Sequence, residues 1–199
     1  MAYAIAYGLH TLEMAALRGW GVAFLAYVAA STGATYTMIS PTVALTALAL
    51  LGTLVSLAGN EAAIYFGRRS LVAAAIAGSV LLAVALALFG VRSYPLAVAL
   101  MLAYGMVIWL DSASLTAGTA GTAEPSRRGA TLAMHSSLGY AGGFIGPLAV
   151  GLVLDVSGGN ATAWSAAFGL IAAIMLASLV VFLIMRPRAL AGDRGGQDS

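Results

Sequence analysis

The chain has 199 residues, of which 61% are hydrophobic and only 8% are charged, and its net charge is +2. A soluble domain normally has about a quarter of its residues charged, so this composition predicts an integral membrane protein. The absence of cysteine excludes disulfides, thiolate catalysis and cysteine-based metal sites. With only two histidines we expect no metal site, and we expect no cofactor. We expect no nucleic-acid partner either, because all nine basic residues are arginines whose placement follows membrane topology.

The apolar stretches predict six membrane crossings between residues 18 and 186. The run from Gly19 to Asn60 has no charged residue and is too long for one crossing, and a polar turn at Ser40–Pro41 divides it. Before it, residues 1–17 predict a cytoplasmic or interfacial lead-in, with a disordered start as the alternative. The polar, Gly-rich residues 187–199 predict a disordered cytoplasmic tail. The crossings are expected at about 18–38, 42–64, 71–91, 95–121, 129–153 and 165–185.

The arginines are distributed unequally between the two sides that six crossings define. One side has Arg92 alone. The other side has the remaining eight: Arg18, Arg68, Arg69, Arg127, Arg128, Arg186, Arg188 and Arg194. Because cytoplasmic loops carry an excess of arginine and lysine, both termini are predicted to be cytoplasmic, in the plasma (inner) membrane of a prokaryote.

Polar residues are distributed unequally among the crossings as well. The third and sixth are almost purely apolar, whereas the first, second, fourth and fifth contain hydroxyl, amide, acidic and imidazole side chains. Polar side chains in a membrane tend to face the bundle interior or a watery cavity. Two mixed crossings followed by one apolar crossing, repeated once, predict an all-α protein with a 3+3 inverted repeat, an arrangement typical of secondary transporters.

The fifth crossing has an unusual composition. Gly129 to Leu154 contains no Asp, Glu, Lys or Arg and would be roughly 39 Å long as a helix. Small residues let membrane helices approach closely, and proline supplies a kink. We expect this helix to pack statically or to bend during a transport cycle, through Gly139, Gly142, Gly143, Gly146 and Pro147.

Three motifs are distinctive: Gly67-Arg68-Arg69, Glu124 to Gly129, and the Gly-Pro segment of the fifth crossing. Together they resemble the C-terminal six-helix half of major facilitator superfamily transporters. Gly67, Arg68 and Arg69 resemble the second copy of the superfamily's G-x-x-x-D-x-x-G-R-R loop. Glu124 to Gly129, with Arg127 and Arg128, is similar to the acidic–Pro–Arg–Gly approach to the eleventh helix. The Gly-Pro segment of the fifth crossing is the third similarity.

The chain departs from this family in two ways. The loop motif has Ile64 where an acid is expected and Asn60 where glycine is expected, so Glu61 can face Arg68 or Arg69 in the acid's place. In addition, the family has two six-helix halves and this chain holds one. Either it is a fragment, or it pairs with a second half or with a copy of itself.

Asp111 is the sharpest candidate site residue. It lies roughly 24 Å along a helix that starts near Pro95, so it is inside the membrane if that helix continues to about Gly121, and interfacial if the helix ends near Trp109. An ionisable group within the membrane is costly and usually functional. His135 is predicted at a similar depth, where it either relays protons with Asp111 or bonds to a carbonyl or to Ser136.

The remaining candidates are weaker. Ser112 and Tyr140 can line a solute cavity, although hydroxyls in membrane helices often bond their own backbone. No motif of a serine hydrolase, metalloprotease or nucleotide-binding loop occurs, so we do not expect an enzyme.

These observations predict secondary transport of a small solute by alternating access, coupled to protons through Asp111. The alternative is a non-transporting fragment or membrane assembly partner that packs through its Gly-rich helix faces. The sequence identifies neither the solute nor the direction of transport.

Overall fold

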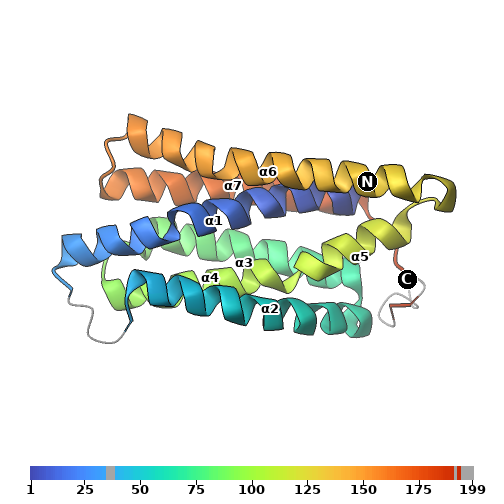
Figure 1. Ribbon diagram of the computed structural model, residues 1–199, viewed down its shortest axis with the longest axis horizontal. Coiled ribbons are helices and arrows are strands. Elements are labelled where there is room, and N and C mark those ends of the chain that lie inside the picture. Colours follow the sequence, from blue (N-terminus) through green and yellow to red (C-terminus); the bar gives the residue numbers. More distant parts are fainter. Residues whose placement is uncertain (35–38, 191, 194–199) are drawn as a thin grey trace.

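The computed structural model describes residues 1–34, 39–190 and 192–193, and every regular element in these ranges is a helix (Figure 1). The elements are α1 (Ala2–Thr32), α2 (Pro41–Phe66), α3 (Arg68–Phe89), α4 (Tyr94–Leu110), α5 (Ser112–Thr122), η1 (Pro125–Arg127), α6 (Arg128–Val156) and α7 (Ala161–Met185). The described part of the chain has six helical segments long and apolar enough to cross a membrane, with α4 and α5 forming one of them. The predicted fold class is confirmed.

The helices run alternately along the long axis of the bundle, so that the start of α1 and the end of α7 lie at the same end of it (Figure 1). Local sequence sets the turns between them. Ser40 caps α2 by accepting a hydrogen bond from the Val43 amide at 3.2 Å, and Pro41 follows at the first helical position. Asn160 caps α7 in the same way. Gly67 separates α2 from α3 with a φ of 92°, a conformation that favours glycine.

The helix pairs with the most extensive contact are α1 with α6, α3 with α7, and α2 with α4. Exchanging the first crossing with the fourth, the second with the fifth and the third with the sixth converts the α1–α6 pair into the α2–α4 pair. The same exchange leaves the α3–α7 pair unchanged. A 3+3 repeat produces this pattern of contacts.

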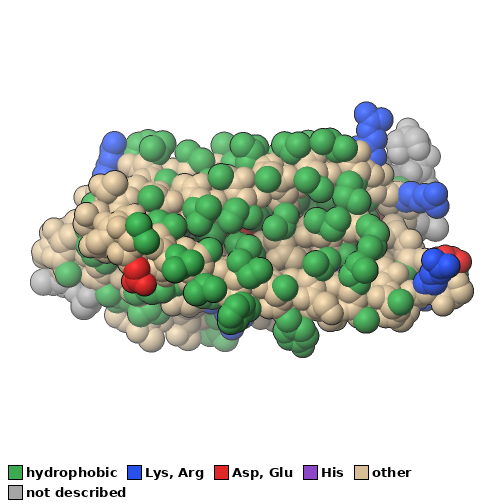
Figure 2. Space-filling model, turned by 90° about the horizontal axis from the view of Figure 1, so that it is seen from above, with side chains coloured by type: hydrophobic (Ala, Val, Ile, Leu, Met, Phe, Trp, Pro, Cys, Tyr) green, Lys and Arg blue, Asp and Glu red, His purple; other side chains and the backbone are tan. Residues whose placement is uncertain are grey.

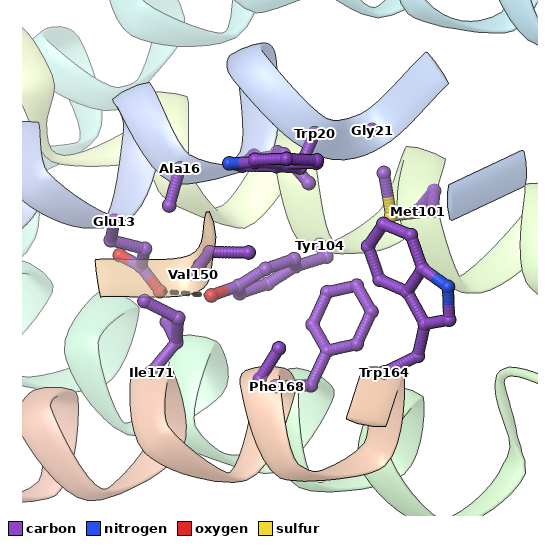
Figure 3. A pocket seen from close by; sticks show the side chains of 12 residues that line it. Glu13, Ala16, Trp20, Gly21, Met101, Tyr104, Val150, Trp164, Phe168 and Ile171 are labelled. Carbon is purple, nitrogen blue, oxygen red and sulfur yellow. Dashed lines mark hydrogen bonds between the residues drawn. The ribbon is translucent and has the colours of Figure 1, made fainter. Parts of the chain in front are cut away.

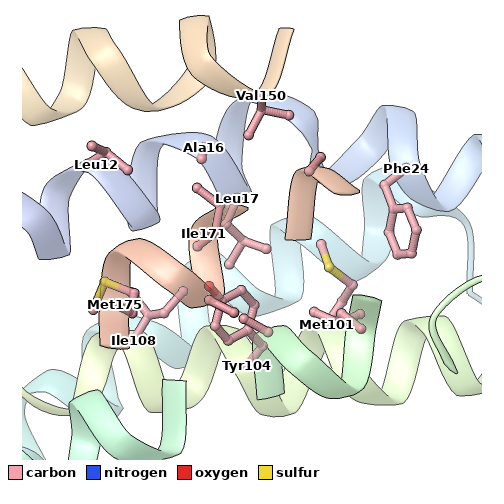
Figure 4. Packing of buried hydrophobic residues seen from close by; sticks show 14 of the residues in the cluster. Leu12, Ala16, Leu17, Phe24, Met101, Tyr104, Ile108, Val150, Ile171 and Met175 are labelled. Carbon is pink, nitrogen blue, oxygen red and sulfur yellow. The ribbon is translucent and has the colours of Figure 1, made fainter. Parts of the chain in front are cut away.

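The core contains side chains from both repeats. Figure 4 shows Leu12, Ala16 and Leu17 of α1 with Met101, Tyr104 and Ile108 of α4 and Ile171 and Met175 of α7. The outer surface is also apolar. Figure 2 shows hydrophobic side chains along the whole face in view, with most charged side chains near its two ends. Such a surface suits a hydrocarbon surrounding.

The first crossing begins earlier than predicted. Residues 1–17 are not a separate lead-in, because all but Met1 belong to α1, and the predicted end of this crossing at residues 35–38 lies outside the described residues. His10 and Glu13 lie in this predicted lead-in, but both are buried inside the bundle. Arg18 consequently lies midway along α1, not on the arginine-rich side. The other five boundaries differ from the predicted ones by a few residues.

Glycines hold α6 against α1. A Cβ atom at Gly142 would collide with the backbone carbonyl of Gly8, and one at Gly146 would collide with that of Leu12. Gly139 lies under the ring of Tyr7, whereas Gly143 has no described atom within 4 Å of its would-be Cβ. Three of the four predicted glycines therefore form contacts inside this chain.

Pro147 does not interrupt α6, which is helical from Arg128 to Val156. Its carbonyl accepts a hydrogen bond from the indole N–H of Trp20 at 2.8 Å, which is a further tie between α6 and α1. Among the described crossings, the helical break falls at Asp111 instead. A bending motion of α6 stays a prediction.

Replacing Gly142 with alanine is expected to lower the free energy of unfolding by about 1–3 kcal/mol, because the added methyl group forces α6 away from α1. Gly143→Ala is the matched control. Both positions are inside the same helix and gain a similar helix propensity of up to about 1 kcal/mol, but only Gly142 has a backbone against it. Unfolding of the purified chain in mixed detergent, followed by circular dichroism, measures the difference. Equal effects of the two substitutions would contradict the close contact.

Candidate functional site

Four ionisable or phenolic side chains meet in the interior, between α1 and the α4–α5 junction. His10, Glu13, Tyr104 and Asp111 are each at most 3% exposed. They form two contacts, His10 with Asp111 and Glu13 with Tyr104. Each contact joins the first crossing of one repeat to the first crossing of the other. Buried polar groups in a membrane are rare and usually functional, so this cluster is the candidate site.

Asp111 lies in the one-residue break between α4 and α5, with φ −101° and ψ −4°. On its N-terminal side, the carbonyl of Leu110 is pressed against Gly59 of α2, where a Cβ atom would not fit. On its C-terminal side, α5 has the sequence SASLTAGTAGT, which is a weak helix former. The crossing therefore continues past Asp111 to Thr122 and does not end near Trp109. Of the two alternatives for Asp111, this is the one that places it inside a crossing.

The partner of Asp111 is His10 and not His135. Nδ1 of His10 lies 3.2 Å from Oδ1 of Asp111. The other ring nitrogen, Nε2, is buried and has no hydrogen-bond partner within the described residues. His10 is not among the predicted site residues, because the prediction from the sequence sets residues 1–17 outside the first crossing. The signal for it is the spacing of His10 and Glu13, which are three residues apart on one face of a mostly apolar helix.

Glu13 has one bonded oxygen and one free oxygen. The hydroxyl of Tyr104 donates to Oε1 at 2.6 Å, and Oε2 is buried without a partner in the described chain. The carboxyl group stands at the wall of a cavity that is otherwise apolar (Figure 3). Figure 3 shows the aromatic rings of Trp20, Trp164 and Phe168 around the same space. The cavity is small, and the Glu13 carboxyl group and the Tyr104 hydroxyl are the oxygen-bearing side-chain groups at its otherwise apolar wall.

His135 forms hydrogen bonds with threonines and forms no ion pair with Asp111 in the described chain. This arrangement is closer to the alternative in which its ring bonds to a carbonyl or to Ser136 than to a proton relay with Asp111. Its Nδ1 shares a hydrogen bond with the Thr119 hydroxyl at 3.1 Å, and its Nε2 lies 3.4 Å from the hydroxyl of Thr116. The ring stacks on Tyr7, with centroids 3.7 Å apart. Tyr7 also stacks more loosely on His10, at 6.1 Å. The two histidines thus flank one tyrosine but do not share an acid.

Two adjoining hollows open on the outer side of α1. One lies between α1 and α6 and is bordered by Tyr7, Thr11, Ser136 and Tyr140. The other lies between α1, α2 and α4, and the two hollows have Met14 in common. Neither is lined by α3 or α7. Tyr140 is 82% exposed and borders the first hollow, whereas Ser112 lines neither, and a role of these two residues in a solute cavity stays a prediction.

The family model of the Major Facilitator Superfamily matches residues 4–199. The chain belongs to this superfamily. It is therefore a multi-pass membrane protein of a transporter family, and the resemblance seen in the sequence is confirmed. A comparison with curated proteins gave no match.

The superfamily loop motif takes an unexpected partner in this chain. The Arg68 guanidinium donates to Oδ1 of Asn60 at 3.0 Å and to Oδ1 of Asp193 at 3.1 Å. Glu61 does not replace the missing acid, because it and Arg69 are exposed and have no ion-pair partner in the described ranges. The replacement comes from the C-terminal tail, where Asp193 is buried instead of disordered. The rest of that predicted tail, residues 191 and 194–199, lies outside the described residues.

The arginines before α6 are surface groups. Arg127 and Arg128 are exposed, and Arg127 lies 3.7 Å from the carboxylate of Glu124. An exposed pair of this kind contributes little to stability. They lie at the same end of the bundle as Arg68, Arg69, Arg186 and Arg188. Arg92 is the one arginine at the opposite end of the described bundle (Figure 1).

Replacing Tyr104 with phenylalanine removes the 2.6 Å hydrogen bond to Oε1 of Glu13 and leaves that buried carboxyl group with one donor fewer. We expect the free energy of unfolding to fall by about 1–3 kcal/mol. Tyr140→Phe is the matched control, because the same hydroxyl is lost from a side chain that is 82% exposed. Thermal unfolding in detergent compares the two variants. If Tyr104→Phe were as stable as Tyr140→Phe, Glu13 would not depend on the phenol.

Proposed function

We propose that the chain is one six-helix half of a secondary transporter that moves a small solute across the plasma membrane of a prokaryotic cell. The half alternates between two arrangements, and protons drive the cycle through Asp111 and His10. Membership of a transporter superfamily supports the first part of this proposal. The Asp111–His10 contact supports the second.

The buried His10–Asp111 pair is the observation that carries the proton role. Histidine changes charge near neutral pH, and a charged imidazole is stabilised next to a carboxylate when water is excluded. When His10 loses its proton, the attraction to Asp111 weakens and the aspartate becomes a buried, poorly compensated charge. Because the pair joins α1 to the α4–α5 junction, this change favours a different arrangement of the two crossings.

The break at Asp111 supports the same role. In secondary transporters, discontinuous helices place backbone and side-chain groups at ion sites near the middle of the membrane. Here the acid occupies the break itself, where a small backbone rotation changes the angle between α4 and α5. A proton arriving at the pair therefore acts on the one described crossing that is already divided.

The positions of the arginines support cytoplasmic termini. Six arginines lie at the end of the bundle where the described chain begins and ends: Arg68, Arg69, Arg127, Arg128, Arg186 and Arg188. Arg18 lies midway along α1 and Arg194 lies outside the described residues, so neither is counted. The excess of arginines at this end over the single Arg92 at the other end remains. Arginine-rich ends face the cytoplasm.

A second half is required to enclose a solute path. The hollows beside α1 are open to the outside of this chain, so either a homologous six-helix half or a second copy completes them. The assembly-partner alternative relied on a Gly-rich face of α6, but Gly139, Gly142 and Gly146 are already engaged by α1. The surface left for a partner is the one that contains the hollows, which favours transport.

Transport is tested in membrane vesicles from cells that produce the full chain, with a panel of labelled small solutes and an imposed pH gradient. We expect gradient-dependent accumulation of at least one solute in wild-type vesicles. Asp111→Asn and His10→Gln are expected to abolish the accumulation and leave downhill exchange in place, because they remove the proton site and not the path. Asp155→Asn is the control, since Asp155 is an exposed acid at the end of α6.

Two outcomes would contradict the proposal at different points. If no solute moved under any gradient, the chain would not act as a transporter. If flux persisted in Asp111→Asn with the pH dependence of the wild type, transport would stand and the proton role would be wrong.

A further inference from the structure

Arg18 is an arginine in the middle of a crossing. Roughly 24 Å of α1 precede it and roughly 21 Å follow it. The other arginines of the described chain stand at helix ends or in the connections between helices. Arg18 is exposed, and it has no ion-pair or hydrogen-bond partner in ranges 1–34, 39–190 and 192–193.

An unpaired charge at this depth needs a compensating group. A long side chain near a helix end can reach the polar interface, but Arg18 is far from both ends of α1. Ionisable residues inside a membrane usually face a water-filled cavity and mark a substrate or ion path. The two hollows on the outer side of α1 provide such a place.

Arg18 borders the hollow between α1, α2 and α4, which Trp109 also lines. Neither this hollow nor the adjoining one is lined by an acidic residue. On α1 itself, Tyr7, Thr11, Met14 and Arg18 follow at intervals of four, three and four residues, which places them on one face of the helix. That face therefore presents the Arg18 guanidinium group to one hollow and the Tyr7 hydroxyl to the other, with Met14 bordering both.

We propose that Arg18 is the anion-recognition residue of the solute path, and that the solute is a small organic anion carrying a carboxylate or a phosphate. A guanidinium binds either group through paired, charge-assisted hydrogen bonds. The hydroxyls of Tyr7, Ser136 and Tyr140 in the adjoining hollow supply further donors, and Trp109 supplies an apolar wall. This inference rests on the proposed function, because it identifies the chemical class of the transported solute.

Trp109 reports directly on the site. The chain has three tryptophans, and Trp20 and Trp164 contact each other at a different cavity. In a Trp20→Phe, Trp164→Phe background, Trp109 is the remaining fluorophore. The purified full-length variant in lipid nanodiscs is titrated with succinate, inorganic phosphate, choline and glycerol. We expect saturable emission changes with succinate or phosphate and none with choline or glycerol, and the responding anion separates carboxylate from phosphate recognition.

Arg18→Gln is expected to weaken anion binding by at least about tenfold, since it removes the charge-assisted hydrogen bonds of the guanidinium group. Arg18→Lys keeps the charge but not the paired geometry and is expected to be intermediate. Arg69→Gln, at an exposed helix end, is the control and should bind as the parent does.

Because Trp20 also donates to the Pro147 carbonyl, its replacement can weaken the fold. The unsubstituted chain therefore provides a second measurement, the rise in thermal unfolding temperature caused by the same anions. An absent anion response in both measurements, or a response that is unchanged in Arg18→Gln, would overturn the proposal. Binding is read without flux, so a chain that bound anions through Arg18 but moved no solute would contradict only the transport function.

Discussion

The contact between His10 and Asp111 is the constraint on which the arrangement of the two repeats depends. An isolated charge in a low-dielectric interior is strongly unfavourable, and a carboxylate and an imidazole offset this cost only when they meet. The chain brings them together by running α1 past the α4–α5 break. Glu13 and Tyr104 form a second polar contact between α1 and α4, so two polar contacts fix the first crossing against the fourth.

Close contact between small residues makes this position of α1 possible. Gly142 and Gly146 admit the backbone of α1 onto α6 on one side, while Gly59 admits the Leu110 carbonyl onto α2 on the other. Both contacts lie in pairs of helices that the repeat relates, α1–α6 and α2–α4. The glycines therefore work as positioning elements for the buried polar cluster. The same approach leaves the outer face of α1, with Arg18, open to a partner half.

Much of the fold was predictable because hydropathy and the arginine positions are direct consequences of the bilayer. The number of crossings and the repeat follow from these patterns, whereas the resemblance to the superfamily comes from the loop motifs and the Gly-Pro segment of the fifth crossing. The site was predictable only in part. Asp111 was found from its depth, but its partner was not, because pairing depends on which helices touch. His10 and Glu13 lie in the segment predicted to precede the first crossing, whereas their contacts with Asp111 and Tyr104 permit them inside it. Asp193 was beyond prediction for the same reason.

The most direct measurement of the central claim is nitrogen-15 nuclear magnetic resonance of the histidine-labelled chain in lipid bilayers. The sequence has two histidines, so the His10 and His135 signals can be assigned by substitution. If His10 and Asp111 share a transported proton, the His10 signals will change between neutral and protonated forms from about pH 5 to 9, and Asp111→Asn will alter that change without affecting His135. A His10 ring that keeps one protonation state throughout, or that titrates identically without Asp111, would contradict it.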